Sequence, residues 1–128
     1  MAQEDRPIIL YVEDDESLRM LTEYVLESQF RVIAASSGAA ALGLATGLAP
    51  ALLLLDVVMP GLDGIETLTA LRALPHLAHL PAVFMTGRVE AVGADVFARL
   101  APVSALAKPY EPNDLVDALH AALGEAGR

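Results

Sequence analysis

The sequence predicts a single α/β domain built on a parallel sheet, and three observations support that class. Short apolar segments alternate with longer segments of helical periodicity along the chain. The apolar segments end at polar or turn-forming residues, which is typical of strands buried on both faces of a parallel sheet. The length of 128 residues suits one domain of ordinary size. We therefore expect one domain over residues 1–128.

The stretch 52–61 is the most distinctive of the apolar segments. Four consecutive leucines run into Asp56, and a Met-Pro-Gly turn follows two residues later. We expect a buried strand at about 51–55, with Asp56 at its carboxyl end, where open α/β sheets bind their ligands. Aspartate also commonly begins a turn, and Asp56 alone would favour that simpler role. The polar residues at the other strand ends favour a reactive carboxylate.

The remaining elements follow the same alternation. The expected strands are 8–12, 30–34, 51–55, 81–85 and 103–107, and the expected helices are 17–27, 39–45, 63–74, 89–100 and from about 112 onward. In the first helix, Leu18, Leu21 and Val25 are expected to face inward. Asp63 and Glu66 resemble a capping box for the third helix. Such alternation predicts a parallel sheet covered on both faces, with right-handed crossovers and the strand order 2-1-3-4-5.

Composition excludes several classes of function. The chain has no cysteine, so disulfides, thiolate zinc sites and thiol catalysis are excluded. Its net charge of −9 argues against direct binding of nucleic acid or an anionic membrane, and is compatible with binding a cation. No apolar run reaches transmembrane length and the N-terminus lacks a signal-peptide pattern. We expect a cytoplasmic protein with no output domain in this chain.

Polar side chains stand at the carboxyl ends of four expected strands. Glu13 and Asp14 follow the first strand, Asp56 the third, Thr86 the fourth and Lys108 the fifth. These strands are contiguous in the expected order, so the side chains should form one polar pocket. Clustered carboxylates repel each other unless a cation intervenes, and oxygen ligands of this kind suit Mg²⁺. A carboxylate nucleophile, a metal, a hydroxyl and an ammonium are the components that phosphoryl transfer requires.

Four stretches give the chain a recognisable pattern: Val12-Glu13-Asp14-Asp15, the Asp-x-x-Met-Pro-x-x-Asp-Gly stretch at 56–64, Met85-Thr86-Gly87 and Lys108-Pro109-Tyr110. With them the sequence resembles the response-regulator receiver domain of bacterial two-component signalling over nearly its whole length. The form that it resembles is a single domain like the chemotaxis regulators. The resemblance implies a flavodoxin-like (βα)5 three-layer sandwich.

The resemblance also implies roles for the polar residues. Asp56 would be the phosphoacceptor, and Thr86 and Lys108 would bind the phosphoryl oxygens. Mg²⁺ would be held by Asp14 directly, by Glu13 through water, by Asp56 and by the backbone carbonyl of Val58. The residues thus assigned are catalytic Asp56, Thr86 and Lys108, and metal-binding Glu13, Asp14, Asp56 and Val58.

Two further expectations follow from the family. The spacing from Asp14 to Arg19 resembles the family's spacing from its second acid, which assigns Glu13 and Asp14 as the pair and leaves Asp15 at the helix start. The Lys108-Pro109 bond would be cis. The partners implied are a sensor histidine kinase or a histidine phosphotransfer protein, and a downstream protein target.

The chain departs from the family pattern at two positions, 105 and 87, and Arg88 follows the second of them. Ala105 stands where many members have a Tyr or Phe that rotates on activation, so the response would pass through loop movement or a different surface. Gly87 follows Thr86, where alanine is commoner, and loosens the loop. Arg88 is predicted either to overhang the phosphoryl site and tune the lifetime of the phosphorylated state, or to pair with a nearby acid.

Three other functions are alternatives to that of a receiver domain. A Mg²⁺-dependent phosphatase with an aspartyl-phosphate intermediate would carry Asp-x-Asp after its first strand, and this chain has Glu-Asp-Asp there. A receiver-shaped scaffold that is never phosphorylated would not need Asp56, Thr86 and Lys108 together. A flavin carrier would need a phosphate-binding loop where this chain has acids. The residues favour the receiver.

Overall fold

The computed structural model describes residues 5–126 and contains one parallel sheet. The strands are β1 (Ile8–Val12), β2 (Arg31–Ala35), β3 (Leu52–Asp56), β4 (Ala82–Thr86) and β5 (Val103–Ala107). The α-helices are α1 (Glu16–Leu26), α2 (Gly38–Ala45), α3 (Gly64–Arg72), α4 (Ala94–Leu100) and α5 (Pro112–Ala126), and short 3₁₀ turns occupy η2 (Pro75–Leu77) and η3 (Val89–Ala91).

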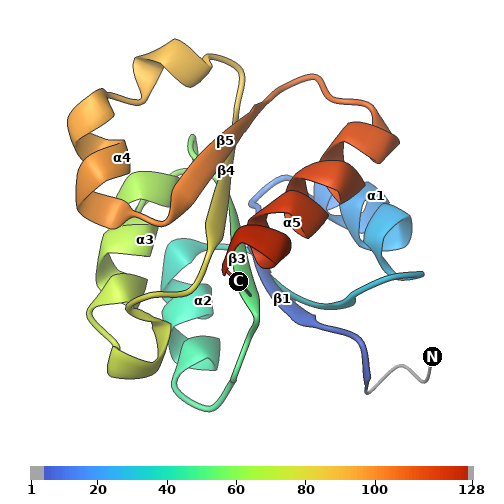
Figure 1. The fold of residues 1–128 in the computed structure, drawn as a ribbon, viewed down its shortest axis with the longest axis horizontal. Helices are drawn as coiled ribbons and strands as arrows, with labels where there is room; N and C mark the ends of the chain where they lie inside the picture. The colour runs from blue at the N-terminus through green and yellow to red at the C-terminus, as the bar shows by residue number, and fades with distance from the viewer. Residues whose placement is uncertain (1–4, 127–128) are drawn as a thin grey trace.

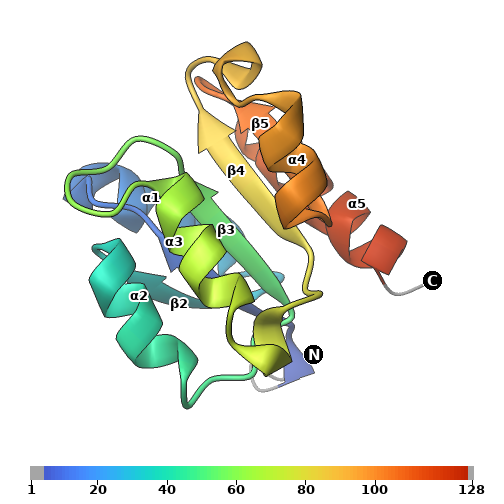
Figure 2. The same ribbon diagram turned by 90° about the vertical axis from the view of Figure 1, so that its left-hand side faces the viewer.

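The strands lie in the order β2-β1-β3-β4-β5, as the sequence predicted. Helices α1 and α5 cover one face of the sheet (Figure 1), and α2, α3 and α4 cover the other (Figure 2). The expected α/β class and three-layer arrangement are therefore confirmed. All strands run in the same direction, so their carboxyl ends meet at one edge of the sheet.

The two layers of the core meet at β3, which is buried at all five positions. Leu53 and Leu55 pack with α2, α3 and α4, whereas Leu52 and Leu54 pack with α1 and α5. All four leucines have no exposed surface, and each fully buried leucine contributes about 1.5–3 kcal/mol to stability. A strand anchored in this way on both faces holds Asp56, its last residue, in a fixed position.

Three strands begin and end one residue later than the sequence suggested. β2, β3 and β4 each extend to the polar or small residue that was expected to follow them, so Asp56 and Thr86 are the last residues of their strands. Backbone pairing continues beyond β3, because Val57 N donates to Met85 O at 3.0 Å. The Asp56 carboxylate is therefore carried by the rigid sheet.

The prediction of one helix from 89 to 100 was wrong. A 3₁₀ turn at Val89–Ala91 is followed by an extended residue, Val92, and α4 begins only after Gly93, its N-cap. Glycine weakens a helix interior, which explains why the periodic pattern is interrupted here. The third helix likewise ends early, because Pro75 keeps Leu74 extended (ψ 123°).

One expected core position of α1 was also wrong. Leu21 is 59% exposed, whereas its neighbour Thr22 is 1% exposed and faces the sheet with Leu26. The capping predictions were correct: Asp15 accepts a hydrogen bond from Leu18 N, and Asp63 forms a capping box with Glu66.

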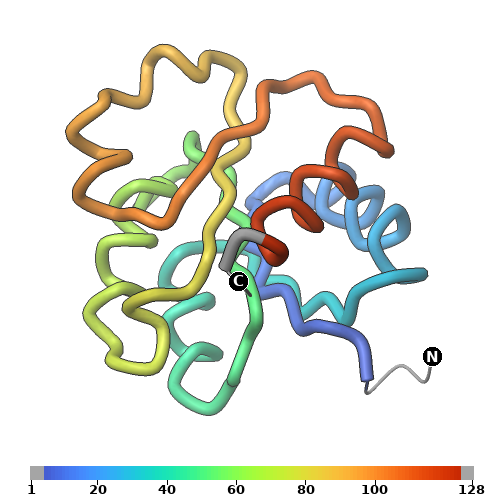
Figure 3. The backbone as a smooth tube through the Cα atoms, in the orientation of Figure 1, coloured from blue at the N-terminus to red at the C-terminus, as the bar shows by residue number. Residues whose placement is uncertain are grey.

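The Lys108-Pro109 bond is cis, as the family resemblance implied. The connection that follows it passes over the edge of the sheet toward α1, as the backbone tube shows (Figure 3). Among the helices of residues 5–126, none has the length and apolar character needed to span a membrane.

Candidate functional site

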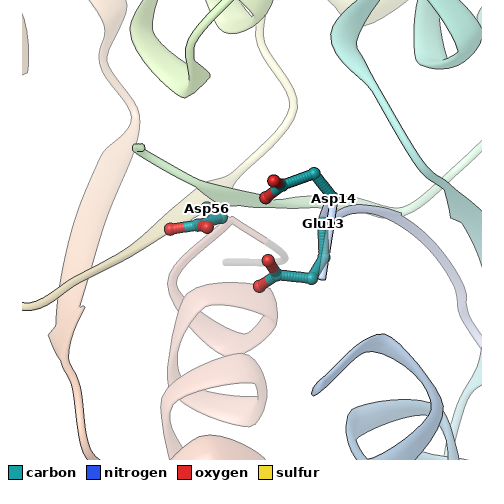
Figure 4. Close-up of side chains that lie close together, drawn as sticks. All are labelled: Glu13, Asp14 and Asp56. Atoms are coloured by element: carbon teal, nitrogen blue, oxygen red, sulfur yellow. The ribbon is translucent and has the colours of Figure 1, made fainter. Parts of the chain in front are cut away.

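Three carboxylates converge at the carboxyl edge of the sheet. Glu13 and Asp14 follow β1, and Asp56 ends the neighbouring strand β3, in a register that pairs Val12 with Leu55. Ligand oxygens of the three acids all lie within 4.8 Å of one another. In Figure 4 the side chains of Glu13 and Asp14 both point toward Asp56. The convergence expected from the sequence is therefore present for these residues.

The three acids differ in burial. Glu13 is 1% exposed and Asp56 6% exposed, while Asp14 lies open to solvent. The backbone around Glu13 is firmly held, since its N–H donates to Ala35 O at 3.0 Å and its carbonyl accepts from Arg19 Nη1 at 2.9 Å. In the sequence, the spacing to Arg19 indicated only which two acids form the pair. In the structure, the Arg19 side chain also donates the hydrogen bond that fixes the acidic loop.

Lys108 supplies the positive charge of the site. Its Nζ lies 3.1 Å from Asp56 Oδ1 and 3.5 Å from Glu13 Oε1. Its backbone N–H donates to Thr86 O at 2.7 Å, which ties the end of β5 to the end of β4. The Lys108 side chain is 25% exposed, so these contacts form in a setting where water screens them only partly. One ammonium thus holds two nearly buried carboxylates together.

The site is short of positive charge, and the pKa of Glu13 is raised as a result. Burial and the nearby Asp56 charge raise the pKa of Glu13 from 4.5 to about 7, although Lys108 opposes the rise. Burial by itself would lower the pKa of Lys108, but the hydrogen bond and charge of Asp56, together with Glu13, raise it above its ordinary value. Three oxygen-bearing acids with one cation among them have the donor chemistry of a site for a hard divalent cation.

The main chain of Asp56 is fixed by a close approach from α3. Gly64 begins that helix, and a Cβ at this position would overlap the carbonyl oxygen of Asp56. Gly64 N donates to Val57 O at 2.8 Å, and Val58 N lies 3.4 Å from Asp56 Oδ1. No structural role for Gly64 was predicted from the sequence, where the Asp-Gly pair that closes the motif at 56–64 is the only signal of one.

Thr86 and Val58 reach the same edge of the sheet without joining the carboxylate cluster. The Thr86 hydroxyl accepts from Arg88 N at 3.2 Å and donates to Arg88 O at 3.4 Å. Within residues 5–126 no hydrogen bond joins it to Glu13, Asp14 or Asp56. The Val58 side chain is 75% exposed beside the site. The roles expected for the Thr86 hydroxyl and the Val58 carbonyl remain predictions.

Arg88 adopts the second of its two expected arrangements. Its Nε lies 3.4 Å from Glu90 Oε1, and both side chains are more than 70% exposed, at 78% and 73%. Such an exposed pair contributes little to stability. The guanidinium is thus paired with a surface acid two residues away.

Fold and site together define a class of protein: an α/β domain with a carboxylate-rich centre, of a kind that could hold a cation, at the edge of a parallel sheet. Residues 9–120 match the family model described as the response regulator receiver domain. The chain therefore belongs to the receiver-domain family of two-component response regulators.

Known proteins of the same family resemble the chain in sequence and in structure. It is 36% identical over 108 residues to the alkaline phosphatase synthesis transcriptional regulatory protein PhoP of Bacillus subtilis, covering 84% of this chain and 44% of PhoP. It is 33% identical over 109 residues to an uncharacterised 14.6 kDa protein of Leptolyngbya boryana, covering 84% of this chain and 83% of that protein. A crystal structure of a putative response regulator from Chloroflexus aurantiacus superposes with a TM-score of 0.83 at 29% identity, covering 93% and 98% of the two chains. The chain spans about half the length of several curated relatives that it matches.

Proposed function

We propose that this receiver domain accepts a phosphoryl group on Asp56 from the phosphohistidine of a sensor kinase or a histidine phosphotransfer protein. The observation that carries the proposal is the environment of Asp56. Asp56 is 6% exposed and ends a rigid strand, and its carboxylate lies 3.1 Å from the Lys108 ammonium. Glu13 and Asp14 place further oxygens within 4.8 Å. These are the positioning and charge that phosphoryl transfer needs.

In the proposed reaction an Asp56 carboxylate oxygen attacks the phosphorus of the donor. The new O–P bond forms as the N–P bond breaks, and the bonding pair returns to the imidazole nitrogen. The Lys108 ammonium and the Thr86 hydroxyl would bind two phosphoryl oxygens. Glu13, Asp14, Asp56 and the Val58 carbonyl would hold Mg²⁺, which when bound neutralises charge on the acids and the phosphoryl oxygens.

Receiver domains are signalling modules rather than enzymes in the ordinary sense, and the proposal keeps this chain within that description. It would catalyse its own phosphorylation and, by attack of water on the same phosphorus, its own dephosphorylation, with no separate substrate. The change would be read by a downstream protein. The net charge of −9 favours a protein partner over nucleic acid. The exchange would take place in the cytoplasm, where phosphohistidine donors are made from ATP.

The proposal is tested by incubating the protein with acetyl phosphate and Mg²⁺ and measuring its intact mass. We expect the wild type to gain one phosphoryl group and Asp56→Asn to gain none. Asp63→Asn is the matched control, because Asp63 caps α3 and asparagine caps a helix equally well. A scaffold would gain no phosphate, and a phosphatase would release phosphate with steady turnover; either result would contradict the proposal.

A further inference from the structure

The loop between β1 and α1 carries both acids of the proposed metal-binding pair, and its backbone is held at each end. Glu13 N donates to Ala35 O of β2 at 3.0 Å. Asp15 N donates to Glu13 Oε2 at 3.3 Å, and the Asp15 side chain caps α1. These contacts leave out the middle residue, Asp14, which is exposed although its carboxylate belongs to the cluster.

Arg19 reaches back from the first turn of α1 to this middle residue. Its Nη1 donates to Glu13 O at 2.9 Å and makes a longer contact with Asp14 O at 3.5 Å. In the part of the chain that the structure describes, this longer contact is the only hydrogen bond at Asp14. The half-buried Arg19 side chain thus ties the carbonyls of both acids to the helix.

The Arg19 guanidinium is directed at carbonyl oxygens even though four consecutive acids occupy 13–16. Across residues 5–126 no ion pair joins Arg19 to a carboxylate. Lys108 behaves differently, because its ammonium contacts the carboxylates of Asp56 and Glu13 directly. Arg19 therefore does not occupy the carboxylate oxygens that would bind a cation, and acts instead on the backbone that carries them.

Such an arginine has two opposing effects on a cation at the cluster. Its positive charge repels Mg²⁺, so removal of the charge alone would strengthen binding. Its hydrogen bonds restrict the backbone of the acid pair, so less conformational freedom is lost when the cation binds. Groups that orient metal ligands through hydrogen bonds commonly raise the affinity by roughly ten- to a hundredfold. Because water and salt screen the charge of a half-exposed guanidinium, we expect the second effect to be the larger.

We propose that Arg19 is a positioning residue for the cation site. By donating to the carbonyls of Glu13 and Asp14, it holds the acid pair, before any cation is bound, in the arrangement that receives Mg²⁺. Arg19 touches neither the cation nor the phosphoryl group. The inference rests on the proposed function, because it concerns the Mg²⁺ that phosphorylation of Asp56 would use.

The test compares Mg²⁺ binding by Arg19→Met and by the wild type, measured by isothermal titration calorimetry. Methionine keeps the apolar stem and removes both the charge and the hydrogen bonds. We expect the dissociation constant to rise by about tenfold, the lower end of the range for groups of this kind. A role through charge alone predicts the opposite sign. A dissociation constant that is unchanged or lower in Arg19→Met would overturn the inference.

Two further variants serve as control and rescue. Arg31→Met removes an exposed arginine from the first residue of β2, at the opposite edge of the sheet, and should bind Mg²⁺ like the wild type. Arg19→Lys keeps the charge but loses the planar fork of donors, and its dissociation constant should lie between those of wild type and Arg19→Met. If Arg19→Met does not fold, Arg19→Lys decides: weaker binding than wild type supports the inference, and equal binding overturns it.

Ionic strength and stability separate positioning from charge and from a general loss of structure. Each variant is first unfolded with urea in EDTA, and Mg²⁺ is titrated only under conditions in which the variant is fully folded. The ratio of the dissociation constants of Arg19→Met and wild type should persist or grow at high salt, because salt screens only the opposing charge effect. A ratio that disappears at high salt would overturn the inference.

Failure of the inference is distinguishable from failure of the proposed function. The same samples are treated with acetyl phosphate and Mg²⁺, and their intact mass is measured. If the wild type binds Mg²⁺ and gains a phosphoryl group while Arg19→Met binds Mg²⁺ equally well, the positioning role alone is overturned. A wild type that neither binds Mg²⁺ nor gains a phosphoryl group overturns both.

Discussion

The Lys108 ammonium lies 3.1 Å from Asp56 Oδ1, although β5, which Lys108 follows, and β3, which Asp56 ends, are not neighbours in the sheet. β4 runs between them, so the lysine stem crosses the end of that strand to reach the carboxylate. The same ammonium approaches Glu13 beyond β1 at 3.5 Å. One side chain thus joins groups from the ends of three strands.

Because Lys108 competes with any cation for the same oxygens, Lys108→Met should strengthen Mg²⁺ binding. We expect the dissociation constant to fall by roughly tenfold, or about 1.4 kcal/mol. Isothermal titration calorimetry measures it directly. Arg88→Met removes an exposed cation that pairs with Glu90 and should change little. Weaker Mg²⁺ binding in Lys108→Met would show that the lysine supports the cation site rather than opposing it.

The assignment of the acid pair is tested by two adjacent residues. Asp14 belongs to the carboxylate cluster, whereas the side chain of Asp15 caps α1 by accepting from Leu18 N. Asp14→Asn should weaken Mg²⁺ binding by at least about tenfold, while Asp15→Asn should leave it unchanged, since asparagine is an equally good cap. Asp15→Ala should lower the free energy of unfolding by about 1 kcal/mol. If Asp15→Asn lost more Mg²⁺ affinity than Asp14→Asn, the acid pair would be Asp14 and Asp15 and not Glu13 and Asp14.

Without metal, the raised pKa of Glu13 makes stability depend on pH. The folded protein holds this proton up to about pH 7, whereas the unfolded chain releases it near 4.5. Between these values the folded state binds more protons, so the free energy of unfolding falls as pH rises, by up to about 3 kcal/mol in total. Urea unfolding in EDTA across this window measures the slope.

Glu13→Gln is the comparison that isolates this slope, because glutamine cannot titrate. We expect the fall with pH to be smaller in Glu13→Gln than in the wild type and unchanged in Glu111→Gln, whose side chain is exposed. If the free energy of unfolding depended on pH equally in Glu13→Gln and wild type, the pKa of the buried Glu13 carboxyl would not be raised by folding.

Gly64 should be intolerant of any side chain. Because an added Cβ would overlap the Asp56 carbonyl oxygen, Gly64→Ala should lower the free energy of unfolding by about 1–3 kcal/mol. Gly43, in the exposed middle of α2, has no atom within 4 Å of such a Cβ, and Gly43→Ala should instead stabilise by about 0.5–1 kcal/mol. Chemical denaturation of both variants measures these changes. If Gly64→Ala were as stable as the wild type, the steric explanation for this glycine would be wrong.

The sequence predicted most of the sheet because its signals are local. Unbroken apolar runs such as 52–55 identify buried strands, and their alternation with helices leaves few topologies. It also predicted which acids meet, since parallel strands end at one edge. The burial of Asp56 inside its strand, rather than after it, depends on backbone pairing with β4 and could not be seen in the apolar pattern.

The errors arose where tertiary contacts outweigh periodicity. Leu21 fitted the apolar stripe of α1, yet the inward position belongs to Thr22, whose hydroxyl pairs with Tyr110. No local pattern indicates that contact, because the partner follows β5 near the other end of the chain. The error at Gly93 has a different, local cause, since this glycine interrupts a segment that looked like one helix and becomes the N-cap of α4.

The central claim is that Asp56 reacts, and that it does so because Mg²⁺ and neighbouring strands assemble around it. The protein is treated with acetyl phosphate in Mg²⁺ or in EDTA, and the acyl phosphate is trapped with hydroxylamine, which converts the reacted aspartate to a hydroxamate. Peptide mass spectrometry then locates the modified residue. We predict modification at Asp56 alone, and only with Mg²⁺; modification at Asp14 or Asp63, or equal modification in EDTA, would contradict the account.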